Sequence, residues 1–197
     1  RTIGFDLEPG MIEYAQARAE RAGVADRSAY FVGDMRGFDA QVEHGSVGLA
    51  FNLINTVRHL ETDEDALRHF EATARVLAPR GVYVVGISLT VYGLEPPSED
   101  VWEGARGSCH VSQVVQYLPP MDGGGDRMEA VYSHLTITRP GGEEHRPSQY
   151  ALRAYDLDQW RGLIGRSALR EVAVLEQDGT ACEATAPGYS LWVLAAR

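Results

Sequence analysis

The chain has 197 residues and a formal net charge of −10, from 18 Lys and Arg against 28 Asp and Glu. This length suits one domain with an insertion better than two domains. The acidity argues against a nucleic acid partner, because a protein that binds a duplex needs a basic face. No apolar run approaches the roughly 18–20 residues that cross a bilayer, so a membrane role is not expected either.

The cysteines and the N-terminal sequence indicate in which cellular compartment the protein is expected. Cys109 and Cys182 stand far apart without a metal-binding spacing, which argues against a disulfide framework or a zinc site, and no metal is expected. No secretory signal pattern is visible, since the chain opens on a strand-like run. A reducing cytoplasm is therefore the expected location.

Strand and helix patterns alternate over the first ninety residues. Short apolar runs predict strands, and apolar residues at helical spacing predict helices with Pro9 in the first turn of one of them. Pro79-Arg80-Gly81 is expected to end the second helix. Strands are predicted at 2–6, 29–33, 47–53 and 82–87, and helices at 9–22 and from 62 to the break at 79–81.

The pattern changes after the fourth strand. Residues 92–105 are rich in Pro, Gly and acids and predict a loop, and 106–153 alternate apolar and polar residues as three antiparallel strands would. Asp156 is expected to cap a short helix, and two strands are expected at 169–176 and 189–195. We therefore expect an α/β, Rossmann-like, doubly wound and mainly parallel sheet with an antiparallel terminal strand. Residues 1–91 and 154–197 would form this core, and the antiparallel β insertion at 92–153 would cover a substrate or form a dimer contact.

Acidic residues follow two of the predicted strands. In open α/β sheets ligands bind beyond the carboxyl ends of the strands. Asp6 stands where a carboxylate accepts hydrogen bonds from the hydroxyls of a ribose, and Asp34 stands where it can accept from an adenine amino group. Met35 offers a backbone N–H and Met11 an apolar face for the base. Each also has a plain structural interpretation, as a capping acid, a turn Asp or a core Met.

Four segments together resemble the class I S-adenosylmethionine-dependent methyltransferases. They are Ile3–Ala15, Val32–Arg36, Ala50–Leu60 and Arg75–Tyr83, and in the last one Arg80 replaces a glycine that is usual in the family. The resemblance implies S-adenosylmethionine as the cofactor. It implies cofactor contacts at Asp6, Leu7, Met11, Asp34, Met35, Asn52, Leu53 and Asn55.

The family's first strand and glycine loop should precede Asp6, and the sequence begins five residues before that position. That loop lets the backbone approach the cofactor closely. We therefore expect an N-terminally truncated member of the family, which binds its cofactor poorly when it is produced alone.

Candidates for catalysis and for substrate binding lie after the fourth and fifth strands of the family pattern and on the insertion. His59 is the best candidate for a base or a substrate ligand, and Tyr92 could point its hydroxyl into the same cleft. Tyr150 and Arg153, on the insertion, are candidate substrate-binding residues. The alternatives are a surface His and an insertion that covers core or forms a dimer contact.

Methylation of a small molecule, at nitrogen or oxygen, is the function that these residues favour. One alternative is a non-catalytic methyltransferase-like domain that binds or dimerises. A less favoured alternative is an NAD-dependent oxidoreductase, because Gly33-Asp34-Met35 and the antiparallel end strands fit it less well. The expected partners are a small-molecule acceptor and, as an open option, a second copy of the chain, without nucleic acid or membrane.

Overall fold

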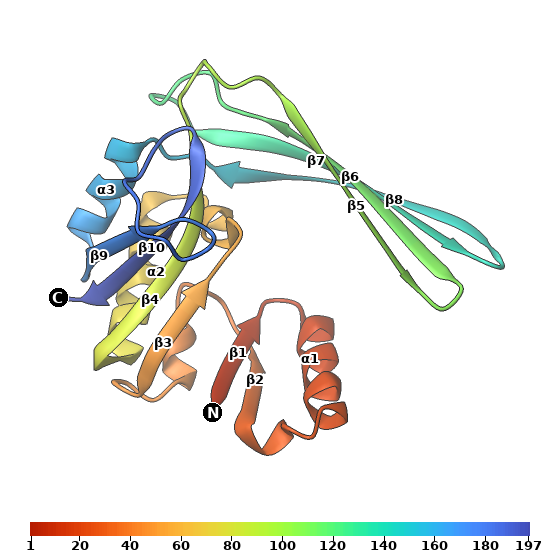
Figure 1. Cartoon of the computed structure of the whole chain (residues 1–197), viewed down its shortest axis with the longest axis horizontal. Coiled ribbons are helices and arrows are strands. Elements are labelled where there is room, and N and C mark those ends of the chain that lie inside the picture. The colour runs from red at the N-terminus through yellow and green to blue at the C-terminus, as the bar shows by residue number, and fades with distance from the viewer.

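The computed structural model describes all 197 residues as a mixed α/β protein with three sheets and three α-helices (Figure 1). A parallel pair joins β1 (Thr2–Asp6) to β2 (Ser28–Val32). A four-stranded sheet has the order β3 (Val47–Asn52), β4 (Leu77–Leu89), β10 (Gly188–Ala196) and β9 (Leu169–Leu175). The third sheet, here called the arm, runs β5 (Ser98–Arg106), β6 (Cys109–Leu118), β7 (Met128–Arg139) and β8 (Gly142–Arg153). The helices are α1 (Pro9–Arg21), α2 (Asp63–Val76) and α3 (Leu157–Arg166).

Each helix begins at a residue that bonds its free N–H groups. Thr62 accepts a hydrogen bond from the backbone of Asp65 at 3.0 Å and starts α2. Asp156 and Gln159 form a reciprocal capping box at the start of α3, so the expected cap is confirmed. Gly23 follows α1 with a φ of 66°, a left-handed conformation that favours glycine.

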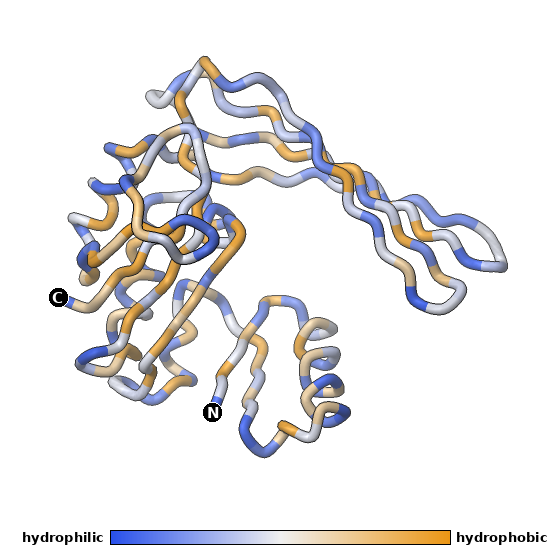
Figure 2. Tube along the Cα trace, viewed as in Figure 1, coloured by the Kyte–Doolittle hydropathy of each residue, from blue (hydrophilic) through white to orange (hydrophobic).

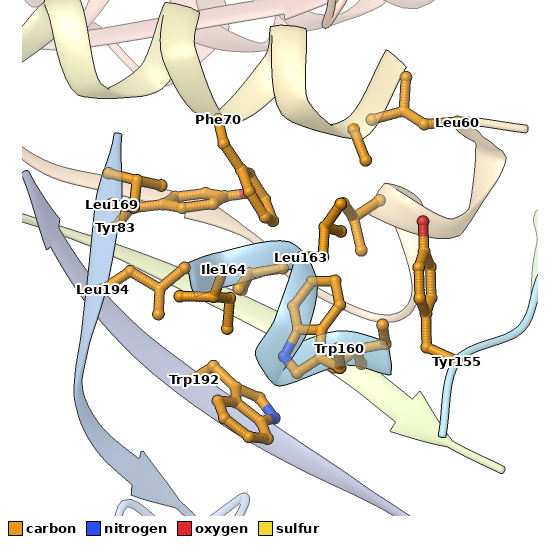
Figure 3. Packing of buried hydrophobic residues seen from close by; sticks show 14 of the residues in the cluster. Leu60, Phe70, Tyr83, Tyr155, Trp160, Leu163, Ile164, Leu169, Trp192 and Leu194 are labelled. Carbon is orange, nitrogen blue, oxygen red and sulfur yellow. The ribbon is translucent and has the colours of Figure 1, made fainter. Parts of the chain in front are cut away.

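The main core lies between the four-stranded sheet and the two helices that cover it (Figure 3). Phe70 from α2 meets Trp160 from α3 edge to face, with ring centroids 5.7 Å apart. Trp160 in turn contacts Trp192 of β10 at 6.2 Å. All three side chains are fully buried, so this aromatic layer anchors α2 and α3 to the sheet that carries the candidate site.

The expected single parallel sheet is divided in the structure. β1 and β3 are each the edge strand of a separate sheet, and both point toward the arm (Figure 1). The two sheets still share a hydrophobic layer, because Phe5 of β1 and Val47 of β3 both pack against a cluster that includes Phe38 and Val76. The ends of β1 and β3 therefore lie on the same side of the molecule, although no hydrogen-bonded strand joins the two sheets.

The insertion differs from the expected loop and three strands. Residues 98–106 form β5, so the arm has four antiparallel strands. Every residue of β5 is exposed, and its acids and Gly104 hide the alternation that marks a half-buried strand. Figure 2 shows hydrophilic residues at the outer hairpin tips of the arm and hydrophobic ones along β4.

The end of α2 also differs from expectation. β4 begins at Leu77, directly after the helix, so Pro79-Arg80-Gly81 lies within the strand. The register between β3 and β4 shifts between Val47 and Leu49, a bulge that accommodates this segment at the sheet edge. None of the three α-helices has both the length and the apolar character required of a membrane span.

Candidate active site

Asp6 and Asp34 lie at the same end of the β1–β2 pair, where both strands end, as the sequence predicts. Asp6 is in register with Val32, and the N–H of Gly33 donates to the Asp6 carbonyl at 3.0 Å. The Asp6 side chain is exposed and accepts one hydrogen bond, from the backbone of Glu8 at 2.9 Å. One carboxylate oxygen thus stays free to accept from a ligand.

Two exposed apolar side chains follow Asp6 in the sequence. Leu7 is 64% exposed and Met11, one turn into α1, is 53% exposed. Large hydrophobic side chains with this exposure next to a free acceptor are typical of a site for a ligand with an apolar ring and a polar sugar.

Asp34 is less free than the sequence suggests. Its carboxylate forms a two-pronged ion pair with the guanidinium of Arg36 and also accepts from the Arg36 backbone at 2.8 Å. The Arg36 side chain holds the pKa of Asp34 below its usual range, so the group is an ionised acceptor. A ligand amino group at Asp34 would have to share this carboxylate with Arg36.

A buried histidine holds the loop that carries Asp34. His69 of α2 donates from Nδ1 to the carbonyl of Met35 at 3.0 Å and accepts at Nε2 from the Tyr83 hydroxyl at 2.9 Å. Burial lowers the pKa of His69 to about 4, so the imidazole is neutral at physiological pH. The sequence contains no signal for this role, because His69 stands in the middle of an ordinary amphipathic helix.

Asn52 closes the other side of this loop, at the end of β3. Its side-chain nitrogen donates to the sulfur of Met35 at 3.2 Å, while its side-chain oxygen is buried and has no hydrogen-bond partner. A buried acceptor without a donor is costly and rare in folded proteins. The site therefore lacks one donor at the place where the sequence predicts a nucleoside.

The loop after β3 is fixed by Asn55. Asn55 has a left-handed φ of 63°. Its amide bonds twice to Ser88 of β4, accepting from the backbone at 2.6 Å and donating to the hydroxyl at 3.0 Å. The side chain thus orients the loop, while the neighbouring Leu53 stays exposed and available to a ligand.

His59 and Tyr150, far apart in the sequence, meet at the base of the arm. His59 lies in the short helix η3 (Thr56–His59), and its ring centroid is 5.5 Å from that of Tyr150 on β8. Neither ring nitrogen of His59 has a hydrogen-bond partner. Burial and then the charge of Arg58 lower the pKa of His59, which favours the neutral form that accepts a proton.

A buried ion pair next to His59 joins η3 to the arm. Arg58 contacts Glu129 of β7 at 2.8 Å, and its Nε donates to the carbonyl of Arg153 at 2.8 Å. The side chains of Arg58 and Glu129 are only 7% and 12% exposed. The sequence does not reveal this pair, because the two residues are 71 positions apart and only Arg58 lies in a segment that resembles the family.

Comparison with known proteins identifies the first part of this assembly. Residues 1–81, from β1 into β4, match a family model described as a methyltransferase domain. This part of the chain, 81 of its 197 residues, is similar to a methyltransferase domain. The match includes Asp6, Asp34 and Asn52, and with the fold it confirms the expected resemblance to S-adenosylmethionine-dependent methyltransferases.

Solved structures extend this fold to the whole chain. A structure described as an S-adenosylmethionine-dependent methyltransferase from Clostridium acetobutylicum has a TM-score of 0.78 at 11% identity, over 100% of this chain and 75% of that one. DesVI from Streptomyces venezuelae has a TM-score of 0.71 at 21% identity, over 100% and 74%. The sugar N-methyltransferase KedS8 from Streptoalloteichus has 0.64 at 18% identity, over 97% and 70%. No curated protein matches the sequence.

Two expected site residues, Tyr92 and Arg153, are bonded to other parts of the fold. The Tyr92 hydroxyl donates to Gln159 at 2.7 Å and contacts the carbonyl of Ala154 at 3.2 Å. It therefore ties the arm connection to α3, and the expected catalytic role of Tyr92 stays a prediction. Arg153 is bonded to Asp63 of α2 at 2.8 Å, so its guanidinium fastens the arm to the core and is not free for a substrate.

Proposed function

We propose that this protein is an S-adenosylmethionine-dependent methyltransferase that acts on nitrogen or oxygen of a small molecule. The observation that carries the proposal is the alignment of three strand ends on one side of the molecule. β1 ends in the free carboxylate of Asp6, β2 leads to Asp34 and Met35, and β3 ends in Asn52 with its unpaired oxygen. A nucleoside supplies hydroxyl and amino donors together with an apolar ring, which is what these groups require.

The residues of this chain would divide the work of holding such a nucleoside. Asp6 accepts from the ribose hydroxyls, and Leu7 and Met11 offer apolar surface to the rest of the molecule. Asp34 and Asn52 accept from amino groups, with Met35 between them. The bound cofactor supplies a methyl group on a positively charged sulfur, which is transferred in line to the acceptor atom.

His59 is the group that would take the proton. When a hydroxyl or a protonated amine is methylated, the nucleophile loses one proton, and an imidazole without hydrogen-bond partners can accept it. Tyr150 lies beside His59, with the two rings tilted relative to one another, and gives the acceptor an aromatic surface. The arm would exclude water from this face, and positioning together with fixed dipoles accounts for most of the rate enhancement in such reactions.

The acceptor class follows from the small-molecule proposal. One similar structure is described as a sugar N-methyltransferase, so amino sugars are the first acceptors to test. A homodimer stays part of the proposal, because the outer strand β5 is exposed along its whole length and an unpaired edge can add a second copy.

Binding of S-adenosylhomocysteine to the 197-residue chain tests the cofactor site. Ligand-observed NMR or calorimetry should show an affinity for S-adenosylhomocysteine that falls at least tenfold in Asp6→Ala and less in Asp6→Asn, because the amide keeps one acceptor oxygen. Asp26→Ala, at an exposed acid in the turn before β2, is the matched control and should bind as the parent does. Equal binding by Asp6→Ala, or preferential binding of NADH, would exclude the proposed site.

A further inference from the structure

An open cavity lies away from the strand ends, between α1 and the tip of the arm. It has a volume of about 500 Å³ and is lined by Tyr14, Arg18, Arg21 and Ala22 of α1 and by Arg106 of β5. Figure 1 shows the β5–β6 hairpin extending over the side of the molecule where α1 lies. The volume is within the range of small-molecule sites, and two segments far apart in the sequence form it.

Three of the five lining residues are arginines without an acidic partner. None of Arg18, Arg21 and Arg106 takes part in an ion pair, whereas ten other arginines of the chain do so within 3.5 Å of a carboxylate. On the helix, Arg18 and Arg21 have no Asp or Glu three or four positions away on either side. In a chain with a net charge of −10, three unpaired cations around one cavity are unexpected.

Placing these three arginines together costs free energy through like-charge repulsion, which a bound anion would offset. Like charges three positions apart on a helix destabilise it slightly, and the arm brings a third guanidinium to the same place. The Tyr14 hydroxyl lies 3.4 Å from Arg18, and Arg18, with smaller contributions from Arg106 and Arg21, lowers the pKa of Tyr14. The field in the cavity is therefore positive, with a phenol positioned to donate as well.

We propose that this cavity binds a phosphate-type oxyanion, either free or as part of a larger phosphorylated molecule. Guanidinium groups donate pairs of parallel N–H bonds that match the oxygens of a phosphate. Contributions from α1 and from the arm mean that the anion also links the arm to the body. The site is separate from Asp6 and His59, and it does not depend on the proposed methyl transfer.

Calorimetric titration with sodium pyrophosphate at pH 7.5 and constant ionic strength of about 0.15 M tests the proposal, since screening at this salt removes loose surface attraction. Arg18→Gln and Arg106→Gln should each weaken pyrophosphate binding by about tenfold, the usual effect of losing one charge-assisted hydrogen bond. Arg170→Gln, on β9 outside the cavity, should leave binding unchanged. All these arginines are exposed, so circular dichroism and the melting temperature should show that each variant folds.

A parallel titration with uridine diphosphate separates the two sources of the anion. Equal affinity for the two ligands would support a site that recognises phosphate groups alone, and tighter binding of the nucleotide would support a site that also contacts the attached organic part. The proposal fails if the parent chain does not bind millimolar pyrophosphate. It also fails if Arg106→Gln binds as the parent does, because then the arm takes no part.

Discussion

At the scale of single residues, two histidines have different roles, because one imidazole is free and the other has both nitrogens hydrogen-bonded. His59 has no hydrogen-bond partner and lies beside the ring of Tyr150, whereas both nitrogens of His69 are bonded within the fold. Both have a pKa below the usual range because of burial. The geometry therefore suits His59 for proton transfer and His69 for holding the loop of Asp34.

We expect His59→Gln to lower the methylation rate by about 10²–10⁴, the usual contribution of a positioned base. Binding of S-adenosylhomocysteine should be unchanged, because His59 lies outside the proposed nucleoside contacts. Measuring the turnover of an accepted amino sugar and the ligand affinity in the same preparation separates the two effects. A parent-like rate would show that the acceptor needs no base from this residue.

The stability of the protein should fall as the pH drops from about 6.5 toward 4, because of His69. Its pKa is about 4 in the folded protein against 6.5 ordinarily, so over this range the unfolded chain binds the extra proton. The shift corresponds to a loss of about 3 kcal/mol of unfolding free energy. Urea unfolding at pH 7.5 and 4.5 checks this value.

His69→Gln is the matched control for that pH dependence. Glutamine can bond both partners of His69 but does not titrate, so the variant should lose clearly less stability over the same pH range. Identical pH profiles for parent and variant would show that His69 is not the group responsible.

At the scale of elements, three ion pairs link the arm and its base to the core. Arg58 pairs with Glu129, and Asp63 accepts from Arg127 and Arg153. The apolar cluster inside the arm contains only three buried residues. The position of Tyr150 over His59 thus depends on these ion pairs.

Glu129→Ala should reduce the unfolding free energy by about 3–5 kcal/mol, because it leaves the Arg58 charge buried without a partner. The double variant Arg58→Met with Glu129→Leu should recover most of this loss, since apolar side chains fill the space without charge. Chemical unfolding of the three proteins measures the difference. A single variant as stable as the parent would show that water reaches the Arg58 guanidinium.

At the scale of the whole molecule, the β1–β2 pair and the four-stranded sheet differ in how many of their strands are hydrogen-bonded on both sides. β4 is hydrogen-bonded on both sides and its Val85 and Ile87 are fully buried, while β1 and β2 form only a two-stranded sheet. Two strands alone are marginally stable in water. The part of the molecule that carries Asp6 therefore depends on the hydrophobic layer that it shares with α2.

Backbone amides of β1 and β2 should exchange with solvent much faster than those of β4 and β10. Local opening of a two-stranded pair costs less free energy than opening a strand in the centre of a sheet. Hydrogen–deuterium exchange read by mass spectrometry measures this difference directly. Addition of S-adenosylhomocysteine should slow exchange in β1 selectively if the strand ends hold it. Equal protection of both sheets would mean that the shared layer is enough to make them one unit.

Local patterns in the sequence determined most of the elements and the resemblance to a methyltransferase domain. Strand-end acids after β1 and β2, the caps of α2 and α3, and the alternating segments of the arm all depend on near neighbours, so spacing alone predicts them. β5 was missed because an exposed edge strand needs no apolar alternation.

The tertiary structure decided which of these residues face a ligand. Asp34 is shared with Arg36, and Tyr92 and Arg153 are bonded within the fold. His59 meets Tyr150, and Arg106 lines the same cavity as α1, only because the arm extends over the side of the molecule where α1 lies. Contacts between residues tens of positions apart depend on how the sheets pack against one another, and hydrophobic periodicity within a segment does not encode that packing.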